Sequence, residues 1–104
     1  MQEKRAYARK SIEVDVTCVM DTGGTFAGQS KDISLGGMFI LAEEVPSFGD
    51  SVTIELTLPG ASATLKLPAV VRWADKRAGG FGVQFGLLGA RETHAIATVI
   101  RTLG

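Results

Sequence analysis

The stretch SIEVDVTCVM, residues 11–20, shows the pattern that decides the fold of this chain. Apolar residues occupy every second position from 12 to 20, and polar residues fill most of the positions between them. Successive side chains of a strand point to opposite faces, so this period of two predicts a strand with one buried face. The turn DTGG, residues 21–24, follows it. The stretch therefore predicts the first strand of a half-buried sheet.

The same kind of pattern recurs along the chain. Further strands are predicted at TFAGQSKDIS (25–34), MFILA (38–42), SVTIELTL (51–58), ATLKLPAVVRWAD (63–75) and FGVQF (81–85). MFILA is apolar on both faces. After Gly89 the period becomes helical, with one apolar stripe at Ile96, Val99, Ile100 and Leu103. The pattern predicts an all-β fold, with about six short antiparallel strands in a barrel or sandwich and a C-terminal helix covering one end or side.

Length and charge exclude several classes of protein. The 104 residues are enough for one domain with one core. The 11 basic and 11 acidic residues cancel, whereas a nucleic-acid binder normally has a basic surplus. We therefore predict no nucleic-acid partner, and any anion site must be local.

The cysteine content and the lengths of the apolar segments predict where in the cell the protein is found. Its single cysteine, Cys18, cannot form an intramolecular disulfide, as suits a reducing compartment. The first ten residues, MQEKRAYARK, have no apolar core of the signal-peptide kind, and no apolar run reaches the ~20 residues that span a bilayer. A cytoplasmic protein without direct membrane insertion is expected, and Met1 suggests a complete stand-alone domain.

Catalytic and metal-binding patterns are missing from the sequence. The single histidine, His94, is expected on the solvated side of the helix. One histidine and one cysteine do not make a metal-ligand cluster of ordinary spacing. Ser34 does not lie in the G-x-S-x-G turn of a nucleophile elbow. We predict that the chain is not an enzyme and holds no metal.

The stretch RAYAR places Arg5 and Arg9 four residues apart. Guanidinium groups are planar and permanently charged, and their N–H donors can clamp phosphate oxygens or the edge of a guanine. By spacing alone, a solvated basic tail explains the pair better.

The stretch DISLGG is the second candidate for a binding site. If the segment is extended, Asp32 and Ser34 point to the same face. The carboxylate can accept from the N–H groups of a guanine, and the hydroxyl can donate to a phosphate or ring acceptor. Gly37 allows the backbone to approach a ligand closely or to adopt a positive φ. A turn in which Asp32 binds its own amides explains the motif about equally well.

Together, the two stretches resemble the signature of the PilZ domain family, which is R-x-x-x-R ahead of the first strand and [D/N]-x-S-x-x-G between the second and third. The later AVVRW and GGFGVQF segments and the closing helix are also similar to that family, so the resemblance covers almost the whole chain. It implies a six-stranded antiparallel β-barrel with a C-terminal α-helix over residues 11–104. Residues 1–10 would form a flexible N-terminal arm. The implied ligand is the bacterial second messenger cyclic di-GMP, with no cofactor.

The resemblance also implies roles for individual residues. Arg5 and Arg9 would hold the guanines and phosphates of the ligand, Asp32 and Ser34 would bind a guanine, and Gly37 would keep the surface open. Further positions that the resemblance suggests are Lys4, Gly36, Arg72 and Trp73. Lys4 would influence stoichiometry, and Arg72 and Trp73 match an extra arginine or a stacking aromatic. By composition alone, however, Trp73 is expected in the core.

The resemblance implies a receptor whose arm folds over the ligand and whose signal passes to an unidentified effector protein, with motility and biofilm as typical outputs. The chain would be a monomer or weak dimer. One alternative is a PilZ-fold protein-interaction module without nucleotide binding, for instance in motility or pilus assembly. A barrel that binds single-stranded nucleic acid would need a basic groove with aromatic platforms, which zero net charge and 7% aromatic residues disfavour.

Overall fold

Seven strands and one helix form the fold in the computed structural model, which describes residues 10–58, 60 and 63–103. The elements, in chain order, are β1 (Lys10–Ser11), β2 (Asp15–Met20), β3 (Thr25–Ile33), β4 (Gly37–Leu41), β5 (Ser51–Leu56), β6 (Leu65–Asp75), β7 (Gly80–Phe85) and α1 (Ala90–Leu103). All six longer strands and the helix coincide with predicted segments, apart from a few residues at their ends.

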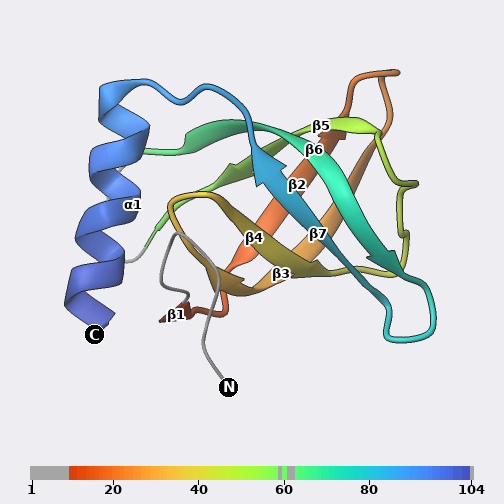
Figure 1. The fold of residues 1–104 in the computed structure, drawn as a ribbon, viewed down its shortest axis with the longest axis horizontal. Coiled ribbons are helices and arrows are strands. Elements are labelled where there is room, and N and C mark those ends of the chain that lie inside the picture. Colours follow the sequence, from red (N-terminus) through yellow and green to blue (C-terminus); the bar gives the residue numbers. More distant parts are fainter. Residues whose placement is uncertain (1–9, 59, 61–62, 104) are drawn as a thin grey trace.

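The six longer strands close into a barrel. Their order is β2-β5-β6-β7-β4-β3, and β3 pairs with β2 as well as with β4, so the sheet has no free edge along this circuit. All pairings are antiparallel (Figure 1). The predicted six-stranded antiparallel barrel with a C-terminal helix is thus confirmed. The two-residue strand β1 is an addition, because it pairs only with the far end of β3.

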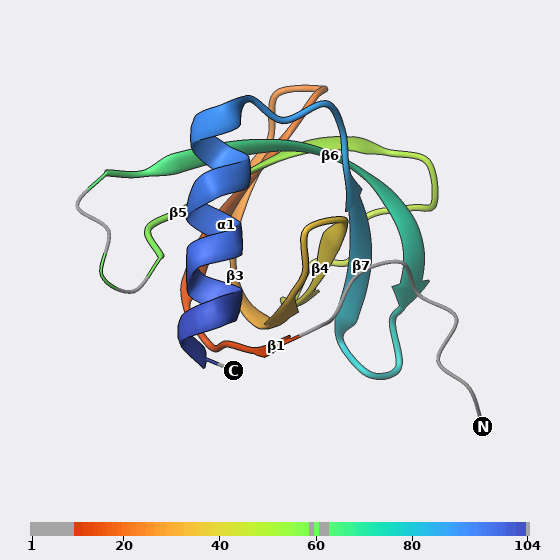
Figure 2. The same cartoon turned by 60° about the vertical axis from the view of Figure 1, so that its left-hand side comes forward.

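The core fills the barrel and continues under the helix. The buried, inward side chains of the strands alternate with half-buried or exposed ones, as in β5. Helix α1 lies alongside the barrel (Figure 2) and buries Ile96 and Val99, two members of the predicted apolar stripe. Glu92 in the first turn and Arg101 in the last suit the helix dipole.

The first predicted strand is interrupted, which corrects the continuous strand expected for residues 11–20. Residues 12–14 lie between β1 and β2. The buried hydroxyl of Ser30 donates to the carbonyl of Ile12 (2.6 Å) and accepts from the amide of Val14 (3.0 Å). A side chain of β3 therefore satisfies backbone groups that a continuous ladder would have paired.

Two strands contain a β-bulge, one extra residue that shifts the register. In β3 the register with β4 shifts between Ser30 and Asp32, which makes Lys31 the extra residue. Alternation from the buried Ser30 would turn Asp32 inward. After the bulge, Ile33 is buried instead and Asp32 lies on the outer face.

The second bulge lies in β6. The side chains that point inward before it are Leu65, Leu67, Ala69 and Val71. The register with β7 shifts between Val71 and Trp73, so Arg72 is the extra residue. Continued alternation would bury Trp73, but the bulge turns it outward. The sequence pattern does not reveal either bulge, because each depends on pairing with a neighbouring strand.

Candidate ligand-binding site

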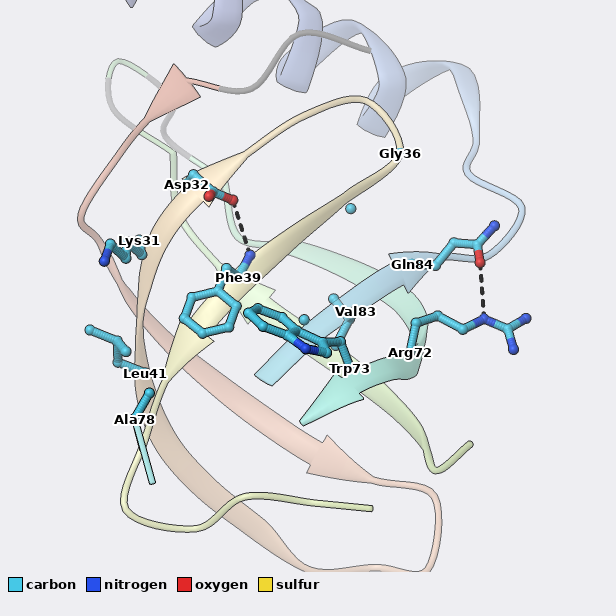
Figure 3. Close-up of a pocket in the computed structure, with 12 residues that line it drawn as sticks. Lys31, Asp32, Gly36, Phe39, Leu41, Arg72, Trp73, Ala78, Val83 and Gln84 are labelled. Atoms are coloured by element: carbon cyan, nitrogen blue, oxygen red, sulfur yellow. Dashed lines mark hydrogen bonds between the residues drawn. The ribbon is translucent and has the colours of Figure 1, made fainter. Parts of the chain in front are cut away.

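An open groove of about 890 Å³ crosses the outer face of the barrel over β3, β4, β6 and β7 (Figure 3). Five of the residues predicted for the binding site line it: Asp32, Gly36, Gly37, Arg72 and Trp73. They come from segments that are some 40 residues apart in sequence and that lie on either side of β7. Barrel closure therefore brings the DISLGG stretch to within one strand of the Arg72–Trp73 pair.

The floor of the groove is an aromatic platform made by Phe39 of β4 and Trp73 of β6. The two ring centroids are 5.1 Å apart and the ring planes meet at 43°. Both residues pair with Gly82 of β7, so the platform spans three strands. A Cβ on Gly82 would lie 3.3 Å from the indole ring, and one on Gly80 would lie 2.5 Å from the phenyl ring. These glycines let the rings lie against β7.

Trp73 is 57% exposed, which corrects the expectation from composition that it belongs to the core. The bulge at Arg72 is the physical cause, because it reverses the face on which Trp73 lies. An exposed large aromatic ring in a groove is a typical binding feature.

Charged and polar groups surround the aromatic platform. Lys31 and Asp32 lie on the β3 side, where the Asp32 carboxylate accepts a hydrogen bond from the Phe39 amide (3.2 Å). On the β6–β7 side, Arg72 Nε donates to Gln84 Oε1 (3.0 Å). Figure 3 shows these two sides separated by the rings. The groove can therefore offer stacking surface together with a carboxylate and two cations.

Ser34 lies beneath the groove, in the turn between β3 and β4, and is 4% exposed. Its hydroxyl accepts from the amides of Gly36 (3.1 Å) and Gly37 (3.2 Å) and donates to the Gly37 carbonyl (3.3 Å). The expectation that Asp32 and Ser34 share an exposed face is wrong, because the extended strand ends at Ile33. The hydroxyl of Ser34 thus satisfies the turn amides of Gly36 and Gly37.

Gly37 is required by the barrel itself. Its φ is not positive, which excludes one of the two reasons predicted for it. A Cβ at this position would overlap the carbonyl oxygen of Val83 in β7. Gly37 therefore permits the close pairing of β4 and β7 that forms the end of the groove.

Lys4, Arg5 and Arg9 lie outside the residues that the structure describes. The described chain begins at Lys10, which pairs with Ile33, and the next residue, Ser11, pairs with Asp32. Residue 10 was predicted as the end of the arm, and the structure includes it in β1. The part of the chain that the structure describes therefore begins beside Asp32.

Three observations outside the groove concern the histidine, metal binding and the cysteine among the described residues. His94 is exposed, as predicted. No group of three or more His, Cys, Asp or Glu residues in residues 10–58, 60 and 63–103 is arranged to hold a metal ion. Burial raises the pKa of the Cys18 thiol to about 12, which keeps it protonated and unreactive. Within the same ranges, α1 is too short and too polar to cross a bilayer.

The residues that line the groove and were not predicted for the site include Lys31, Phe39 and Gln84. A signal existed for Phe39, because MFILA is apolar on both faces and only one face of a barrel strand is buried. Gln84 alternates with the inward-facing Val83 and Phe85, so its outward direction was also predictable. The position of Lys31 depends on the bulge and was not.

Several solved structures of known proteins have a fold similar to that of this chain. The PilZ domain of YcgR from Escherichia coli with c-di-GMP has a TM-score of 0.76 and 17% identity, over 97% of this chain and 92% of that one. The Bacillus subtilis inhibitor of motility MotI has a TM-score of 0.74 and 24% identity, over 97% of this chain and 52% of that one. The PilZ domain of CeSA from a cellulose-synthesizing bacterium has a TM-score of 0.70 and 22% identity, over 92% of this chain and 94% of that one. This chain thus spans about half of MotI.

A comparison with curated protein sequences finds no match. The model of the PilZ domain, by contrast, matches residues 3–101, which is nearly the whole chain. The barrel, the C-terminal helix and this match agree, and the chain belongs to the PilZ domain family.

Proposed function

We propose that this chain is a receptor for cyclic di-GMP that binds the ligand in the groove and signals through a partner protein. The observation that carries the proposal is the Phe39–Trp73 platform, with its exposed indole, between Asp32 and Arg72. The c-di-GMP in the YcgR PilZ structure supports the choice of ligand. A nucleotide needs a stacking surface, acceptors for its base and cations for its phosphates, and this groove has all three.

Different residues of the groove would bind different parts of the ligand. A guanine would stack on the exposed face of Trp73, as bases do on aromatic side chains. The Asp32 carboxylate would accept from the N–H groups of guanine, and Arg72 would donate to a phosphate. Gly36 and Gly37 have no side chains and would leave room for the ligand at the end of the groove. Ser34 would act by holding their turn, and its direct contact with the ligand stays a prediction.

The arm would complete the site. Arg5 and Arg9 would fold over the ligand from the attachment point at β1 and bind guanine edges and phosphates. Lys4 would adjust how many ligands are held. Ordering of residues 1–10 on the groove would create the surface that an effector protein recognises, in the cytoplasm where the second messenger acts. Motility and biofilm formation are the outputs that we propose to examine first.

Isothermal titration calorimetry of the purified chain with cyclic di-GMP tests the proposal, with GTP and cyclic AMP as controls. We expect saturable binding of cyclic di-GMP alone, at about one or two ligands per chain. Arg5→Ala and Arg9→Ala should each weaken it by roughly 10-fold to 100-fold, since a charge-assisted hydrogen bond contributes about 1.5–3 kcal/mol. A flat titration with folded protein would instead support the interaction-module alternative.

A further inference from the structure

Arg72 has no partner residue on a neighbouring strand that would help to orient its side chain. It is the extra residue of the β6 bulge and has no paired residue in β5 or β7. It is exposed, and it is adjacent in sequence to the exposed Trp73. A guanidinium so close to an indole tends to lie over its face in a cation–π contact. That arrangement would cover the surface on which a base has to stack.

Gln84 supplies the orientation. Its side chain lies on the outer face of β7, and its Oε1 accepts from Arg72 Nε at 3.0 Å. Figure 3 shows the guanidinium held beside Gln84, to one side of the two rings. Because the hydrogen bond uses Nε, the two terminal nitrogens and their four N–H groups stay available for a bidentate contact with a phosphate.

We propose that Gln84 is a positioning residue for ligand binding: it holds Arg72 beside the aromatic platform, which leaves the face of Trp73 open and turns the terminal guanidinium nitrogens toward the ligand's phosphate. This inference rests on the proposed function. The neutral amide matters, because it accepts the hydrogen bond and leaves the positive charge of Arg72 uncompensated. A carboxylate at position 84 would hold the guanidinium equally well and cancel that charge.

A double-mutant cycle with Gln84→Met, Arg72→Met and the double variant measures the coupling by calorimetry with cyclic di-GMP. We expect Gln84→Met to weaken binding roughly threefold to tenfold, the value of one hydrogen bond. In the Arg72→Met background the same change should have no further effect. Lys66→Met removes an exposed cation from β6 away from the groove and should leave affinity unchanged.

Gln84→Glu separates positioning from a merely structural role. It keeps the acceptor, so we expect unchanged thermal stability, but it should weaken ligand binding at least as much as Gln84→Met. Its deficit should shrink as salt rises, because added salt screens the repulsion between the carboxylate and the phosphates. A role in stability alone would not produce this salt dependence.

The chain contains one tryptophan, so quenching of its fluorescence by acrylamide reports on Trp73 without any ligand. We expect quenching to fall in Gln84→Met, where Arg72 is released onto the ring, and to return in the double variant. The inference is overturned if the parent binds cyclic di-GMP and Gln84→Met binds equally well, if its loss persists without Arg72, or if quenching does not change. A parent that does not bind cyclic di-GMP overturns the proposed function together with the binding role of Gln84.

Discussion

Inward and outward side chains alternate in the β2–β5 ladder and also in the two bulged ladders of the groove, β3–β4 and β6–β7. The results of this alternation are opposite. From Val16 paired with Leu56 to Met20 paired with Val52, the β2–β5 register is uninterrupted. In the β3–β4 and β6–β7 ladders, one extra residue shifts the register, and Asp32 and Trp73 reach the outer face. Uninterrupted alternation thus builds the core, and its interruption moves groups to the surface, where they form a candidate site.

The largest expected effect comes from comparing an aromatic residue on the inner face of the barrel with one on its outer face. Phe81 is fully buried and packs edge-on against Phe26, so Phe81→Ala should lower the free energy of unfolding by about 3–5 kcal/mol. Trp73→Ala should cost only about 1 kcal/mol, the value of an aromatic pair, but should weaken cyclic di-GMP binding roughly 10-fold to 100-fold. Urea unfolding followed by circular dichroism, together with calorimetry, measures both. Equal losses of stability in the two variants would contradict the comparison.

Glycines provide the second test. Gly37→Ala places a Cβ on the Val83 carbonyl oxygen, so we expect a loss of about 3 kcal/mol in the free energy of unfolding as β4 and β7 are forced apart. Gly24→Ala is the matched control, because a Cβ there meets nothing within 4 Å and its φ is not positive. It should stay within about 0.5 kcal/mol of the parent. Gly37→Ala with parental stability would show that the barrel adapts at this position.

The break between β1 and β2 can be tested at Ser30. Ser30→Ala leaves the Ile12 carbonyl and the Val14 amide without their partner, and should cost about 2 kcal/mol in chemical denaturation. Ser51→Ala, at an exposed serine in β5, should cost almost nothing. If the two substitutions are equivalent, the hydroxyl of Ser30 does not stabilise the segment between β1 and β2.

The smallest effect, over the pH range from 8 to 10, concerns Cys18 on the core side of the β2–β5 ladder, where burial raises the pKa of the thiol from 9.0 to about 12. Above pH 9 the unfolded chain loses a proton that the folded chain keeps. The contribution of Cys18 is therefore constant below pH 9 and falls by about 1.4 kcal/mol per pH unit between 9 and 12. Cys18→Val should remove this loss, and the difference between the parent and the variant from pH 8 to pH 10 isolates it from other titrating groups. Parallel curves would contradict it.

Much of the candidate site was predictable from local sequence, but its assembly was not. DISLGG was singled out as a candidate binding stretch or a turn, and the structure shows a turn beside Asp32, which lines the groove. The turn itself, however, is held by Ser34, whose hydroxyl has its hydrogen bonds inside it. The composition argument placed Trp73 in the core, and the bulge at Arg72 places it in the groove. Phe39 was visible in the two-sided apolar pattern of its strand and was overlooked.

The sequence by itself determined the strand and helix segments and the family, because periods of two and 3.6 are local properties and the motifs can be read in order along the chain. The tertiary structure decided which side chains meet. The face on which Asp32 or Trp73 lies depends on how many residues separate it from a paired partner on another strand. The pairing is set by closure of the barrel between segments far apart in sequence, so it is absent from any single stretch.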